Sequence, residues 1–110
     1  MSSEHSEQQG FVQWWRHRYP DILLFAIPNG GVRHIATGKA LKDEGVVAGI
    51  PDLFAPRFLL WIEMKTTNGK LSVKQERIIS YLRRIGHTVI VGYGAEDTSR
   101  QVLEFLKCNK

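Results

Sequence analysis

The chain has 110 residues, which suffice for a single domain, spanning residues 1–110, that folds without disulfides. Its formal net charge of +4 suits a polyanionic partner but is also common in other proteins. The single cysteine, Cys108, excludes an internal disulfide and a cysteine-based zinc site. We find no apolar run long enough to span a membrane and no signal-peptide pattern, so we expect a cytoplasmic protein with no membrane association.

The first predicted element is a helix that Ser2 or Ser3 caps and that ends near Arg18, before a Tyr-Pro pair. Projection at about 100° per residue places the following residues on one stripe of this helix: Glu4, Gln8, Phe11, Val12 and Trp15. Glu7 lies nearly a quarter turn from the centre of that stripe. The projection therefore favours Glu4 as a carboxylate that faces inward, and Glu7 remains the alternative.

Residues 22–27 are predicted to form a buried strand that ends at Pro28. The Asn-Gly pair that follows could form a hairpin turn, but residues 34–44 have helical rather than alternating order, and Gly45 is placed as a C-terminal stop. The segment has a basic face beside a glycine-rich loop, which could follow a phosphate backbone; its residues are Arg33, His34, Lys39 and Lys42. An ordinary solvated helix face explains the same charges equally well.

The second half of the chain predicts two strands, a helix, a strand and a helix. The strands comprise residues 52–54, 58–65 and 88–93, and the last helix comprises residues 96–107, with Val102, Leu103 and Leu106 inward. The intervening helix is capped by Ser72 and stops at Gly86, with Ile78, Tyr81, Leu82 and Ile85 on its buried face. A strand-helix-strand crossover implies parallel pairing, so we expect an α/β fold with a mixed sheet flanked by helices.

The residues that point to chemistry are Asp52, at the end of a Gly-Ile-Pro-Asp segment, and Glu63 and Lys65, which follow a run of five apolar residues. Because side chains alternate along a strand, Glu63 and Lys65 share one face, and a tight connection would bring Asp52 beside Glu63. The unbroken apolar run indicates a strand covered on both faces, so the charges come at the edge of a sheet, where ligands bind in α/β proteins. Two carboxylates there are suitable ligands for Mg²⁺, and Lys65 would reach a metal-bound water.

Simpler explanations exist for the same residues. A Glu-x-Lys at a strand end is most often a solvated pair, and a glutamate at a helix start, such as Glu4, often serves the helix dipole. Gln75 follows Ser72 by three residues, so the two can form a capping box in which Gln75 reaches back to the Ser72 amide.

Five segments together resemble the VRR-NUC nucleases, a branch of the PD-(D/E)xK superfamily, and occur in the expected order: residues 28–31, 45–53, 62–65 and 69–72, and Gln75. The resemblance spans about residues 4–106. It implies a restriction-endonuclease-like fold, divalent-metal catalysis and DNA as substrate, often branched. Small standalone members occur in bacteria and viruses, so it also implies an intracellular protein of a bacterial or phage-infected cell.

The resemblance also assigns roles to residues. Asp52, Glu63, the Met64 carbonyl and Glu4 would hold Mg²⁺, for which Mn²⁺ is expected to substitute. Lys65 would orient or deprotonate the attacking water, and Gln75 would lie near this lysine. Whether one or two metal ions bind depends on whether Glu4 points inward. The predicted DNA contacts are Asn29, Gly30, Gly31, Arg33, Lys39 and Lys70.

We therefore expect a metal-dependent, structure-specific DNA endonuclease that cleaves four-way junctions as a homodimer, paired through the Trp14–Trp15 region or the helix of residues 72–85. A flap, fork or general DNA nuclease of the same fold is the nearest alternative. A non-catalytic DNA-binding module is a second, and an interaction protein with a patch of Trp14, Trp15 and Trp61 is a third. Metal titration separates them, because the nuclease alone should need Mg²⁺ or Mn²⁺ to act.

Overall fold

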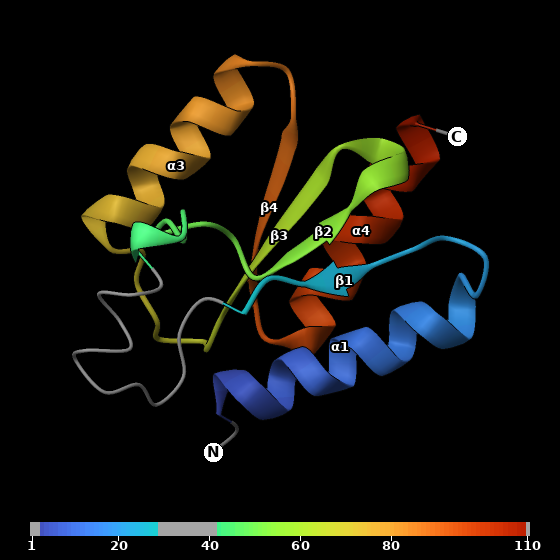
Figure 1. The fold of residues 1–110 in the computed structure, drawn as a ribbon. Helices are drawn as coiled ribbons and strands as arrows, with labels where there is room; N and C mark the ends of the chain where they lie inside the picture. The colour runs from blue at the N-terminus through green and yellow to red at the C-terminus, as the bar shows by residue number, and fades with distance from the viewer. Residues whose placement is uncertain (1–2, 29–41, 110) are drawn as a thin grey trace.

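A computed structural model, which describes residues 3–28 and 42–109, shows a mixed four-stranded sheet with helices on both faces (Figure 1). In chain order its elements are α1 (Glu4–Arg18), β1 (Phe25–Ala26), β2 (Leu53–Ala55), the 3₁₀ turn η1 (Pro56–Phe58), β3 (Leu60–Lys65), α3 (Val73–Arg84), β4 (Thr88–Tyr93) and α4 (Ala95–Cys108). The predicted α/β fold class is confirmed.

The strands lie in the order β1-β2-β3-β4, so β3 is an interior strand. It pairs antiparallel with β2 and parallel with β4, and α3 connects the two parallel strands, as the crossover predicted. Of the six residues of β3, all but Trp61 are buried. Glu63 and Lys65 therefore lie at the end of a strand that is covered on both faces, which confirms the reading of the apolar run.

The two faces of the sheet carry separate cores, and Figure 1 shows α1 and α4 on one side and α3 on the other. On the first face Ile62 and Met64 pack with Phe11 and Trp15 of α1 and Val102 of α4. On the second face the buried residues are Ile79, Leu82 and Val89. Alternation along β3 thus sends Leu60, Ile62 and Met64 to the larger core, and Trp61, Glu63 and Lys65 to the face that α3 covers.

Helix α1 begins and ends where the sequence predicts. Ser3 caps it in a reciprocal capping box with Ser6, and Tyr19 follows its last turn. Trp15 is fully buried, and its indole N–H donates a 2.9 Å hydrogen bond to the Ile22 carbonyl, which fastens the chain after the helix. The polar atom of this large core side chain is thereby satisfied.

Two expectations about apolar surfaces are wrong. The strand predicted for residues 22–27 comprises Phe25 and Ala26 alone, and both are exposed, because β1 is the edge strand and pairs with β2 on one side only. On α3, Tyr81 and Ile85 are each 50% exposed, whereas Ile79 is buried beside Leu82. The helix packs on β4 along a stripe rotated from the predicted one.

Other boundaries differ in detail. Phe58 lies in η1 and Leu59 adopts a left-handed conformation with φ 49°, so β3 starts at Leu60 rather than Phe58. The end of the helix predicted for residues 34–44 is seen at Lys42 and Asp43, and Gly45, with φ 101°, follows as predicted. The rest of that helix lies outside the described residues. No helix in the described ranges has the length and apolar character needed to cross a membrane.

Candidate active site

The two predicted carboxylates lie side by side at one edge of the sheet. Asp52 immediately precedes β2, and the antiparallel register that pairs Leu53 with Ile62 places Asp52 opposite Glu63. The Asp52 Oδ2 accepts a 2.7 Å hydrogen bond from the Met64 amide. The tight turn η1 between β2 and β3 sets this register, so the structure brings the two carboxylates together as the sequence predicted.

Glu63 is a buried carboxylate, 1% exposed, that is only half satisfied. Its Oε2 accepts a 3.2 Å hydrogen bond from the Gln75 side-chain amide. Its Oε1 is buried and has no hydrogen-bond partner within the described part of the chain. Burial, and next the negative charge of Asp52, raise the pKa of Glu63 to about 8. A buried carboxylate with one unpartnered oxygen is stabilised by a cation that contacts that oxygen.

Asp52 shares this environment. Burial raises the pKa of Asp52 from its ordinary value, and the hydrogen bond from the Met64 amide and the positive charge of Lys65 oppose that rise. Both acidic groups are therefore destabilised as anions in the absence of a counter-ion, and Lys65 alone does not compensate them. Perturbed carboxylates of this kind are concentrated at functional sites.

Lys65 lies two residues beyond Glu63 on the same face of β3 and is 8% exposed. Its carbonyl accepts a 2.8 Å hydrogen bond from the Gly94 amide, which fixes the end of the strand. Gly69 lies over its side chain: a Cβ atom at Gly69 would be 3.3 Å from both the Cβ and the Cδ of Lys65. The loop after β3 thus covers the lysine and holds it in the site.

Gln75 has two roles at once. Its amide donates to the Ser72 Oγ at 3.1 Å, and its Oε1 accepts from the Ser72 amide at 2.8 Å, which completes the predicted capping box. Its Nε2 donates to Glu63. The capping role and the site role are therefore compatible, because they use different atoms of the same side chain.

Gly49, part of the Gly-Ile-Pro-Asp segment, makes a close contact that local sequence patterns did not predict. It has φ 91°, and a Cβ atom there would lie 2.8 Å from the Lys74 carbonyl oxygen. The loop before β2 therefore packs directly on the first turn of α3. This contact sets the position of Asp52 relative to Gln75.

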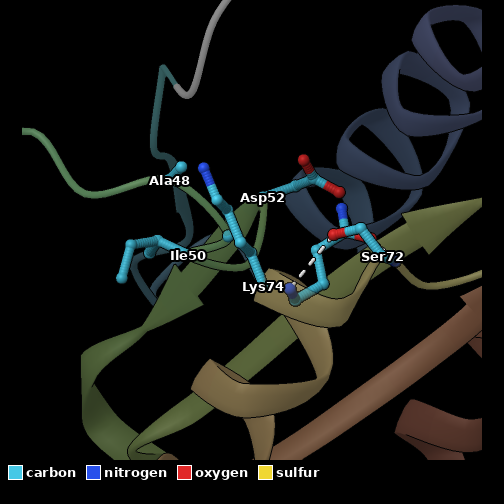
Figure 2. Close-up of a pocket in the computed structure, with 7 residues that line it drawn as sticks. Ala48, Ile50, Asp52, Ser72 and Lys74 are labelled. Carbon is cyan, nitrogen blue, oxygen red and sulfur yellow. Dashed lines mark hydrogen bonds between the residues drawn. The ribbon is translucent and has the colours of Figure 1, made fainter.

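Between the loop before β2 and α3 lies a hollow of about 190 Å³, the α3 pocket. Its lining residues are Ala48, Gly49, Ile50, Asp52, Ser72, Lys74 and Gln75. Figure 2 shows Asp52 and Lys74 on different elements around this pocket, with the Ser72 side chain bonded to the first turn of α3. The pocket adjoins the carboxylate pair.

The two candidate carboxylates of α1 have different surroundings. Glu4 is exposed, so the expectation that it faces the interior is wrong. Its negative charge is nevertheless among the causes that raise the pKa of Glu63, so it lies within electrostatic reach of the site. The Glu7 Oε1 instead accepts a 2.7 Å hydrogen bond from the Ala95 amide, at the first residue of α4. Glu7 thereby caps a helix that has no side-chain cap of its own, and Glu4 remains the candidate for the site.

The chemistry of the paired carboxylates can be compared with what a hard cation requires. Nowhere in the described ranges do three histidine, cysteine, aspartate or glutamate side chains gather as a metal site, so Asp52 and Glu63 form a pair without a third close carboxylate. The unpartnered Glu63 oxygen and the raised pKa values of both groups fit a divalent cation between them.

The structure describes one of the predicted DNA contacts and all three tryptophans of the predicted patch. Lys70 is exposed, whereas Asn29, Gly30, Gly31, Arg33 and Lys39 lie outside the described residues. Trp15 is in the core beside α4, with Trp14 packed against the same cluster, and Trp61 packs on the opposite face of the sheet, where it donates to His87. The three tryptophans therefore do not form one binding patch.

Comparison with known proteins identifies the family. The model of the VRR-NUC domain family matches residues 2–96. A solved structure described as a VRR_NUC domain protein superposes with a TM-score of 0.80 at 20% identity, covering 97% of this chain and 90% of the other, which shows a shared fold. Comparison with curated proteins gives no match. With most of its length matched, carboxylate pair and lysine included, the chain belongs to the VRR-NUC domain family, whose domain is a nuclease-type DNA-processing unit.

Proposed function

We propose that this VRR-NUC domain is a divalent-metal-dependent DNA endonuclease that cleaves branched DNA, four-way junctions above all, as a homodimer. The observation that supports this most is the buried Glu63 carboxylate, with one oxygen lacking a partner in the described structure, beside Asp52 at the edge of the sheet. Two adjacent carboxylates repel a phosphodiester unless a cation lies between them.

In this proposal Asp52 and Glu63 bind Mg²⁺, with Glu4 and the Met64 carbonyl as further oxygen donors, and Mn²⁺ as a substitute. A bound divalent cation would polarise the phosphate and favour the ionised form of a nearby water. The protein residues fix the donors: the Met64 amide orients Asp52, and Gln75 orients Glu63 through its side-chain amide. Held donors of this kind reduce the reorganisation needed at reaction.

Lys65 is the proposed catalytic lysine. It shares the face of Glu63, is 8% exposed and lies under the loop after β3. From there it can orient the attacking water, take its proton in the neutral form, or stabilise charge on the pentavalent phosphate.

The homodimer is proposed because one subunit has one such site, and paired cuts across a junction need two. Of the two surfaces predicted for pairing, the α3 surface is the better supported. Trp15 is fully buried and Trp14 is partly buried, whereas Tyr81 of α3 and Ile85, the residue that follows α3, are each 50% exposed. A two-fold contact through α3 would use these apolar side chains.

A panel of DNA substrates tests the proposal. Linear, flapped, forked and four-way DNA are incubated with the protein in Mg²⁺, in Mn²⁺ and in EDTA. We expect metal-dependent cleavage, with the junction cut fastest and at paired positions. Faster cutting of flaps or forks would establish the nearest alternative substrate class, whereas DNA binding without any cleavage would establish a non-catalytic module.

A further inference from the structure

The α3 pocket holds one cationic side chain whose role the proposed catalytic chemistry leaves open. Its lining residues include one carboxylate, Asp52, and one cation, Lys74, and the remainder are apolar or neutral. Lys74 is exposed and comes from α3, not from the sheet (Figure 2). A cation that flanks a metal-binding carboxylate, across a hollow open to solvent, is well placed for an anion that extends beyond the metal.

No carboxylate in the described ranges forms an ion pair with the Lys74 ammonium. The two ion pairs found there both belong to Arg100, on α4. Lys74 lines the same hollow as Asp52 without forming an ion pair with it. Its ammonium group is instead available to a ligand.

The backbone of Lys74 is held more firmly than an exposed lysine normally is. Gly49 packs against its carbonyl, because a Cβ atom at Gly49 would lie 2.8 Å from that oxygen. The capping box of Ser72 and Gln75 fixes the same turn of α3. The root of the Lys74 side chain is therefore fixed relative to Asp52, through Gly49, and relative to Glu63, through Gln75.

We propose that the α3 pocket is a subsite for the DNA phosphate next to the scissile one, with Lys74 donating to a non-bridging oxygen. Ala48 and Ile50 form the apolar wall against which the deoxyribose packs. The hollow has a volume of about 190 Å³ and lies beside Asp52. This subsite rests on the proposed nuclease function and makes Lys74 a substrate-positioning residue.

The first test measures DNA binding in a fixed concentration of Ca²⁺, a divalent cation that takes oxygen ligands, as a function of NaCl concentration, for the native protein and for Lys74→Ala, Lys74→Arg and Lys107→Ala. Lys107 is an exposed lysine in the last turn of α4, on the opposite face of the sheet, so its variant has the same net charge as Lys74→Ala. We expect Lys74→Ala alone to reduce the slope of log affinity against log salt by about 0.9, the value for one phosphate contact. Equal slopes for Lys74→Ala and Lys107→Ala would overturn the subsite.

The second test locates the phosphate. Single methylphosphonates, which remove the charge of one phosphate, are placed on either side of the cleaved bond, and KM and kcat are measured for the native protein and Lys74→Ala. We expect one neighbouring position to raise KM of the native protein about tenfold and to have little further effect on Lys74→Ala. If the effect of each methylphosphonate on KM were the same in Lys74→Ala as in the native protein at every position, the subsite would be contradicted.

Different results would contradict the nuclease function and the phosphate subsite. A native protein that cleaves no DNA in Mg²⁺ contradicts the nuclease function, and the salt slope in Ca²⁺ still decides whether Lys74 contacts a phosphate. Cleavage by Lys74→Ala with the KM and kcat of Lys107→Ala contradicts the subsite and leaves the nuclease standing. An unchanged thermal midpoint in Lys74→Ala establishes that any loss is not a folding defect.

Discussion

At the residue scale, the burial of Glu63 and its proposed chemistry have opposite effects on its charge. Its place in the interior strand buries it, and burial disfavours its charge, yet its chemistry at the proposed site needs that charge. The Gln75 amide satisfies one oxygen, and a cation would satisfy the other. The stability of the metal-free protein should therefore depend on the protonation of this one group.

The first prediction concerns that pH dependence. Without metal the pKa of Glu63 is about 8 in the folded chain and 4.5 in the unfolded chain. Between pH 4.5 and pH 8 the folded state therefore keeps a proton on Glu63 that the unfolded state has lost. Stability is then full below about pH 4.5 and is lost as pH rises toward 8. Asp52, Glu4 and Lys65 face the same group and contribute to the slope.

Urea unfolding in EDTA at pH 5 and pH 8 measures this effect. We expect the free energy of unfolding to fall by on the order of 3 kcal/mol across this interval, and Mg²⁺ to restore much of it at pH 8. Glu63→Gln, which is neutral at both pH values, is the matched control and should lose most of the dependence. A pH-independent native protein would contradict the assigned state of Glu63.

The second prediction separates the two glutamates of α1. Glu4→Gln should lower the cleavage rate at unchanged stability, because Glu4 is exposed and is a proposed oxygen donor to the metal. Glu7→Gln keeps an acceptor oxygen for the Ala95 amide and should change neither quantity much, whereas Glu7→Ala should cost about 1 kcal/mol of stability. Cleavage rates and urea midpoints of the three variants show which glutamate belongs to the site. A larger loss of activity in Glu7→Gln than in Glu4→Gln would assign Glu7 to the site in place of Glu4.

At the element scale, the site is assembled by contacts between segments that are distant in sequence. The loop before β2 packs on α3 through Gly49, and Glu7 of α1 caps α4. The sequence predicted Asp52, Glu63 and their register, because strand alternation and a short connection are local properties. These two contacts have no local signature, and the family resemblance supplied Gln75 beyond its capping motif.

The same reasoning explains the errors. Residues 22–27 are apolar enough for a buried strand, but sequence does not show that β1 has a neighbour on one side alone. The face that α3 buries depends on how the helix lies on β4, which its own periodicity does not fix. Tyr81 and Ile85 belong to the apolar stripe of the sequence and are half exposed in the single subunit.

The third prediction tests the contact between the loop before β2 and α3. Gly49→Ala should destabilise the fold by about 2 kcal/mol or more, because φ is 91° and the added Cβ meets the Lys74 carbonyl oxygen. Gly45→Ala is the matched control: its φ is 101°, but nothing lies within 4 Å of the added Cβ, so about 1 kcal/mol is expected. Urea unfolding of both variants measures the difference, and equal costs would show that the packing on α3 contributes nothing.

At the scale of the whole molecule, the proposed dimer gives the exposed apolar side of α3 a function. We predict that light scattering gives a mass near twice the 12.6 kDa of one chain at micromolar concentration. Ile85→Glu, on the exposed side of α3, should produce monomers that still bind metal but no longer cut a junction at paired positions. A monomeric native protein, or a dimer that Ile85→Glu leaves intact, would remove α3 as the interface.

The most direct test of the proposed chemistry is the single-turnover cleavage rate of a four-way junction in Mg²⁺, for the native protein, Asp52→Asn and Lys65→Ala. In the proposed mechanism the carboxylate and the lysine act on the reacting phosphate and its water, so each variant should cleave about 10³-fold more slowly or worse, with a native circular dichroism spectrum. Lys107→Ala, distant from the site, should retain the native rate. Native rates in both Asp52→Asn and Lys65→Ala would contradict the active-site assignment.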